Sequence, residues 1–185
     1  FMMIGVFGGF GVAILTAFKH HLAKYTVPAY ALLQGLALGG ISKYFEMRYP
    51  GIVNQAVMLT FGTLGALLLA YRSGLIKATE NFKLGVVAAT GGIAFVYIIS
   101  WILGMFGVGV PMIHGNSNMS ILFSIGVVII AALNLVLDFD FIEEAAEKGA
   151  PKYMEWYGAF GLLVTLVWLY LEILRLLAKL SSRRN

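Results

Sequence analysis

The chain has 185 residues, of which 60% are apolar and 12% are charged, with a mean hydropathy of +0.87 and a net charge of +4. A soluble domain needs about twice this charged fraction to cover its surface, so the composition indicates an integral membrane protein. The absence of cysteine excludes disulfides, and no basic stripe or basic-aromatic cluster supports nucleic-acid binding.

Six apolar runs approach the roughly 20 residues, with ~17 as a lower limit, that a helix needs to cross a bilayer. They cover residues 1–18, 27–42, 52–71, 84–106, 119–141 and 152–180. The second run is the weakest, since it is short and contains Gln34. The runs are continuous, whereas the strands of a barrel would alternate. The sequence therefore predicts an all-α, polytopic transmembrane helical bundle in a single domain, 1–185.

The first residue, Phe1, already lies inside an apolar run with no charged segment or cleavage site before it. This pattern does not fit a signal peptide. We expect the chain to begin part-way through a longer natural protein.

Small residues recur four positions apart within the apolar runs, which places them on one helical face. Such faces let helix backbones approach closely in lipid. None of these glycines lies between a strand and a helix, so a phosphate-binding loop is not indicated. The pairs are Gly5 and Gly9, Gly35 and Gly39, Gly62 and Ala66, and Ala88 and Gly92.

Lysine and arginine are slightly more frequent in the first, third and fifth loops than on the opposite side. Cytoplasmic loops carry the excess of these residues, so the first group predicts the cytoplasmic side, with Lys77 and Lys148 facing the cytoplasm. The residues on that side are Lys19, Lys24, Arg72, Lys77, Lys83, Lys148 and Lys152, against Lys43, Arg48, Lys179, Arg183 and Arg184 on the other.

The fifth run ends in an acidic segment, LVLDFDFIEEAAEKG, which is the strongest functional signal in the sequence. Asn134 and Asp138 are four residues apart and share a helical face, while Asp140 points roughly 160° away. A carboxylate within a membrane-spanning helix is costly and is a functional candidate by default. The acids that follow, Glu143, Glu144 and Glu147, fit a solvated extension of the helix.

The last run contains Glu172 and Arg175, three residues apart, so an intrahelical ion pair is available. Histidines 20, 21 and 114 lie in loops without the spacing of a metal site. No catalytic signature lies within a span. We therefore expect no enzyme activity, no metal and no cofactor.

The hairpin LVLDFDFIEEAAEKGAPKYMEW, followed by a helix ending LYLEILRLL, resembles the Bax inhibitor motif family, in its bacterial Bax inhibitor-1-like branch. The runs AYALLQGLALGGISKYFE, QAVMLTFGTLGALLLAY and FKLGVVAATGGIAFVYIISWILG resemble the family's third, fourth and fifth helices. The resemblance covers nearly the whole chain, with the family's first helix absent. It implies a seven-helix bundle and a pH-sensitive calcium leak, in which two aspartates on the last two helices share a proton.

By this resemblance, Asp138 matches the first aspartate, and the second has two candidates. The motif LYLE nominates Glu172, whereas alignment on Leu-Arg-Leu-Leu nominates Thr165. If the turn centres near Gly149, Glu172 lies roughly 18 Å deeper in the hairpin than Asp138, and Thr165 only ~7 Å deeper. The depth argument favours Thr165, and we expect Glu172 to pair with Arg175 or with a polar group of another helix.

Two functions follow as hypotheses. The first is a passive cation (calcium) leak with Asp138 at its inner mouth, favoured by polar residues expected to face inward: Gln34, Asn54, Gln55 and Asn134. The second is a non-conducting membrane partner that modulates a larger complex, such as a membrane protease, favoured by the interrupted acid pair. In either case the expected partners are the lipid bilayer and either calcium ions or other membrane proteins. The expected location is the bacterial inner (cytoplasmic) membrane.

Overall fold

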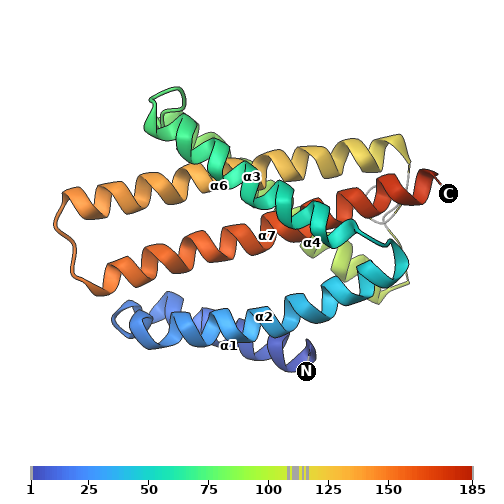
Figure 1. The fold of residues 1–185 in the computed structure, drawn as a ribbon, viewed down its shortest axis with the longest axis horizontal. Helices are drawn as coiled ribbons and strands as arrows, with labels where there is room; N and C mark the ends of the chain where they lie inside the picture. Colours follow the sequence, from blue (N-terminus) through green and yellow to red (C-terminus); the bar gives the residue numbers. More distant parts are fainter. Residues whose placement is uncertain (1, 108, 110–112, 114, 116, 185) are drawn as a thin grey trace. The chain divides into compact units, whose positions relative to one another are not determined.

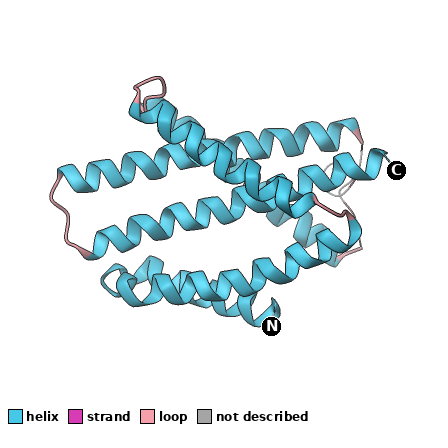
Figure 2. Cartoon of the chain, in the orientation of Figure 1, coloured by secondary structure: helices cyan, strands magenta, loops and turns pink. Residues whose placement is uncertain are grey.

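The protein is helical throughout residues 2–107, 109, 113, 115 and 117–184, the part of the chain that this computed structural model describes, apart from short connections (Figure 1; Figure 2). No strand occurs among these residues. The prediction of an all-α fold is thus confirmed. The helices are α1 (Met2–Phe18), α2 (Ala23–Arg48), α3 (Ile52–Arg72), α4 (Glu80–Met105), α6 (Asn118–Glu147) and α7 (Tyr153–Arg184), and the 3-10 turn η1 (His20–Leu22) precedes α2.

Four of these helices, α3, α4, α6 and α7, are long and apolar enough to cross a membrane. The first two helices meet this criterion only together, as a pair bent by 118° at Lys19. Of the six expected spans, four are therefore single helices that meet the criterion, and the first two form one bent pair. The run around Gln34, which is the weakest in the sequence, belongs to the bent pair.

The chain divides into two compact units. The first unit comprises residues 1–53 and 138–164, and the second comprises residues 54–137 and 165–185. Helices α6 and α7 contribute to both units, since their hairpin end lies in the first unit and their other halves lie in the second. The assignment of residues 1–185 to one domain stays a prediction.

Local hydrogen bonds explain where several helices begin and end. Glu46 accepts hydrogen bonds from the backbone N–H groups of Gly51 (2.6 Å) and Val53 (3.0 Å), which lack partners inside α3. At the end of α6, Gly149 has φ +64, and the Ala150 N–H donates to the Ala145 carbonyl at 3.0 Å. This Schellman arrangement ends α6 and starts the tight turn into α7.

In the first unit, α1 packs against α2 through its glycines. A Cβ atom on Gly5 would lie 2.5 Å from the Leu33 carbonyl oxygen and 2.6 Å from the Ala37 backbone nitrogen. A Cβ on Gly9 would lie 3.0 Å from Gln34 Oε1. The predicted close approach of two backbones is therefore present at this glycine pair.

The same prediction is wrong for the glycines at positions 35, 39, 62 and 92. A Cβ on any of them would meet no described atom within 4 Å, and all four positions are exposed. Four-residue spacing puts small residues on one face, but it does not provide a helix to cover that face. These glycine faces are left open within the described part of the chain.

Replacing Gly5 tests the contact between α1 and α2. We expect Gly5→Leu to lower the free energy of unfolding in detergent by about 1–3 kcal/mol, because the side chain would collide with the backbone of α2. Gly11→Leu is the matched control, since Gly11 lies on the same helix with open space at its Cβ. Equal stability of the two variants would contradict the described packing.

Candidate functional site

Asp138 lies in the first unit, and its side chain is directed at α7. Its Oδ1 atom is 3.5 Å from the position that a Cβ on Gly161 would occupy. One turn along α6, Ile142 Cγ1 lies 2.9 Å from the corresponding position on Gly158. The two glycines allow α6 to approach α7 closely, so the half-buried Asp138 carboxylate lies between the two helices of the hairpin.

The three glutamates that follow Asp138 in α6 have a different environment. Glu143, Glu144 and Glu147 are exposed, and Glu144 forms an ion pair with Lys148 one turn along the helix. They fit the solvated helix extension that the sequence suggests. Asp140 is half-buried like Asp138, and its direction away from the Asp138 face stays a prediction.

Asn134 lies one turn before Asp138 in α6 and belongs to the second unit. Its Nδ2 donates to Thr90 Oγ1 of α4 and to the Ile130 carbonyl, both at 2.8 Å. Thr90 in turn donates to the Val86 carbonyl at 2.8 Å. The amide therefore joins α6 to α4 inside the unit, where its polar atoms are satisfied.

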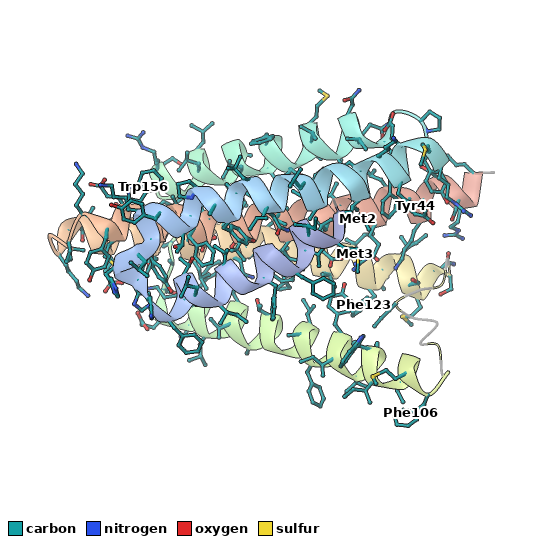
Figure 3. The ribbon with its side chains drawn as sticks, turned by 90° about the horizontal axis from the view of Figure 1, so that it is seen from below. Met2, Met3, Tyr44, Phe106, Phe123 and Trp156 are labelled. Atoms are coloured by element: carbon teal, nitrogen blue, oxygen red, sulfur yellow. The ribbon has the colours of Figure 1, made fainter. Side chains whose placement is uncertain are left out.

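A second polar cluster joins α7 to α4. Arg175 Nη1 lies 3.0 Å from Glu172 Oε1, so the ion pair that the three-residue spacing makes available is formed. The Tyr97 hydroxyl donates to both carboxylate oxygens at 3.0 and 3.1 Å, and Arg175 Nη1 donates to that hydroxyl at 2.9 Å. Phe123, labelled in Figure 3, packs edge-on against the Tyr97 ring at 6.3 Å.

In this cluster the carboxylate of Glu172 has both its charge and its hydrogen bonds satisfied. Glu172 is only 3% exposed, and isolation of its charge at such a position would be costly. The guanidinium of Arg175 balances that charge, and its carbon also lies 5.5 Å from the centre of the Tyr97 ring. Helix α4 is thus tied to α7 by a neutral, hydrogen-bonded group of three side chains.

Lys179 is a buried cation that the sequence assigns, wrongly, to the loops of one side. It is only 6% exposed, and its Nζ donates to Ser120 Oγ and Ser124 Oγ of α6, each at 2.8 Å. Its position four residues after Arg175 continues the polar face of α7, whereas the two serines lie four apart in the first turns of α6. These two spacings are the features of the sequence that could have indicated a buried polar contact between α7 and α6.

Two of the polar residues expected to face inward do not do so. Asn54 and Gln55 are exposed, because the buried face of α3 is formed by Ile52, Ala56 and Thr60, four residues apart. Gln34 is half-buried against Gly9.

The histidines and acids do not gather around a metal position. Among the described residues, no group of three metal-ligating side chains occurs. His20 packs edge-on against Tyr157 at 4.5 Å, and His114 lies outside the described residues.

A family model described as Bax inhibitor 1 like matches residues 1–182, nearly the entire chain. The chain belongs to the Bax inhibitor 1-like family. Searches of curated proteins and of solved structures find no significant match.

The Bax inhibitor 1-like family makes Asp138 and its expected partner on α7 the residues to compare. Asp138 belongs to the first unit, and both candidates for its partner, Thr165 and Glu172, belong to the second. Thr165 is buried, and Glu172 is engaged by Arg175 and Tyr97. The separation of Asp138 from either residue stays a prediction.

Removing the Tyr97 hydroxyl tests the cluster on α7. We expect Tyr97→Phe to lower the free energy of unfolding by about 1–2 kcal/mol, because Glu172 and Arg175 lose a shared hydrogen-bonding partner. Tyr153→Phe, at an exposed tyrosine of α7, is the control and should leave stability unchanged. In a Glu172→Gln background the loss should shrink, and an undiminished loss would show that the hydroxyl does not act through Glu172.

Proposed function

We propose that this Bax inhibitor 1-like protein provides a passive cation pathway, a calcium leak, with Asp138 lining it. The observation that carries the proposal is the half-buried Asp138 carboxylate directed at Gly161 in the α6–α7 hairpin. A carboxylate held between membrane-spanning helices is costly, so such residues usually face a water-filled path or pair with another group. Carboxylate oxygens are also the ligands that calcium prefers.

The charges around the hairpin support the same proposal. Glu143, Glu144 and Glu147 are exposed one to three turns beyond Asp138 on α6. A group of negative charges at the mouth of a path raises the local concentration of cations. Divalent ions would gain most from this, because the attraction scales with their charge.

The proposal assigns pH sensitivity to Asp138 alone. The charge of Glu172 is balanced within the second unit by Arg175, which supports a role in holding α7 to α4. A switch that depends on two carboxylates sharing one proton needs both of them close together. A single carboxylate would give a weaker pH dependence of the leak.

The cellular setting is part of the proposal. We place the protein in the bacterial inner membrane, with the acidic hairpin turn and Lys148 on the cytoplasmic side, as the excess of lysine and arginine there favours. We assign it no enzymatic reaction.

A second candidate is a non-conducting partner of another membrane protein. It is favoured by the open glycine faces of α2, α3 and α4 at Gly35, Gly39, Gly62 and Gly92, where small residues would let a foreign helix pack closely. The ion pair between Glu172 and Arg175 also favours the partner function, because it leaves Glu172 unavailable for a pH switch made of two acids.

Calcium flux into liposomes that contain the purified full-length protein separates these functions. We expect Asp138→Asn to reduce the flux several-fold between pH 6 and 8 and to flatten its pH dependence, because the charged ligand is lost. Asp140→Asn is the matched control, two residues away on α6, and should be nearly silent.

Two results would reject the leak. Equal effects of the two substitutions would indicate a general surface-charge effect. Absence of flux in the wild-type protein would support the partner function, which co-purification of a membrane complex through the open glycine faces would then test.

A further inference from the structure

One end of the second unit carries an excess of positive charge. From position 172 to the end of α7 there is one acid, Glu172, which already balances Arg175. Lys179 has no carboxylate of a described residue within ion-pair distance, because its partners are hydroxyls and a carbonyl. Arg183 and Arg184 are exposed in the last turn of α7. The region is therefore cationic after all the pairing that the structure describes.

Contacts inside the second unit put Arg175 near the end of two helices. Tyr97, its partner on α4, lies eight residues before Met105, and Arg175 lies nine residues before Arg184, so both are roughly 12–14 Å from their helix ends. The end of α4 is marked by Phe106 in Figure 3. Both helices finish on the same side of the unit (Figure 1; Figure 3).

If α7 is centred in the apolar layer, Arg175 lies just inside that layer. Its 32 residues span about 48 Å, whereas the hydrocarbon core is about 30 Å thick. A helix centred in the core extends roughly 9 Å beyond it at each end, so Arg175 would lie about 5 Å below the boundary. An arginine side chain is long enough to reach the phosphate level from that depth.

Arg175 also has unused hydrogen-bonding capacity. Its bonds to described residues all run through Nη1, which leaves Nη2 and Nε without an acceptor among those residues. The side chain is 42% exposed, although Glu172 beside it is buried. Guanidinium N–H groups that face the apolar layer without acceptors would be costly. An acceptor from outside the chain is the simplest way to satisfy them.

We propose that Arg175 binds the headgroup phosphate of an anionic phospholipid at this end of the second unit. A guanidinium offers two parallel N–H donors that match phosphate oxygens. The excess charge of Lys179 and Arg183 favours a lipid with a net negative charge over a zwitterionic one. Trp101, one turn beyond Tyr97 on α4 and 70% exposed, fits the headgroup level at which tryptophan is enriched.

This binding site is independent of the proposed leak, since it lies in the other unit from Asp138. We assign the site to a lipid rather than a soluble anion, because the partly exposed Arg175 belongs to a helix long and apolar enough to cross a membrane.

Quenching of tryptophan fluorescence by brominated lipids tests the proposal. The full chain with Trp156→Phe and Trp168→Phe keeps Trp101 as its one tryptophan. In vesicles that mix brominated phosphatidylglycerol with phosphatidylcholine, and in the reverse labelling, we expect about fivefold preference for phosphatidylglycerol near Trp101. Arg175→Gln should reduce that preference toward one.

Two further variants separate binding from folding and from general charge. Glu172→Gln with Arg175→Gln removes both members of the ion pair, leaves no isolated buried charge, and should also lose the preference. Arg72→Gln removes an exposed arginine at the end of α3 and should retain it.

Three results would overturn the proposal. These are equal affinity for the two lipids in the parent chain, equal losses in Arg175→Gln and Arg72→Gln, and retention of the preference in both Arg175 variants. Concentration-dependent self-association that Arg175→Gln abolishes, without any lipid preference, would instead assign this surface to a second copy of the chain.

Discussion

The contact between α4 and α7 in the second unit depends on the ion pair between Glu172 and Arg175. A carboxylate inside a membrane-spanning helix needs a compensating charge or a wet cavity, and here the charge comes from one turn along the same helix. Because the pair is internal to α7, its geometry needs only the helical spacing of three residues. The Tyr97 hydroxyl hydrogen-bonds to both charged groups and so connects α4 to α7.

This pairing separates the roles of the two acids that family resemblance would join. Glu172 has a structural partner in the second unit, whereas Asp138 lies against Gly161 in the first. A proton shared between two carboxylates requires them to lie within a few ångströms of each other, with neither neutralised by a cation. Asp138 is therefore the acid of the proposed ion path, whereas Glu172 holds α7 against α4.

The sequence predicted what depends on local spacing. The helices follow from the apolar runs, and the Glu172–Arg175 pair follows from a separation of three residues. Contacts between distant segments did not follow, since nothing near Tyr97 in the sequence indicates a partner 75 residues away. Lys179 was assigned to a loop because it lies close to a helix end, and its four-residue spacing from Arg175 indicated a polar helix face without indicating Ser120 and Ser124 as partners.

Solid-state NMR of the protein in lipid bilayers tests the central claim, that Glu172 is the partner of Arg175, most directly. With ¹³C-labelled glutamate and aspartate and ¹⁵N-labelled arginine, the pair is the one close glutamate–arginine contact among the described residues. The account predicts a short-range dipolar coupling between Glu Cδ and Arg Nη that disappears in Glu172→Gln and persists in Asp138→Asn. Absence of this coupling in the wild-type protein, or its replacement by a short contact between the carboxyl carbons of Glu172 and Asp138, would contradict the account.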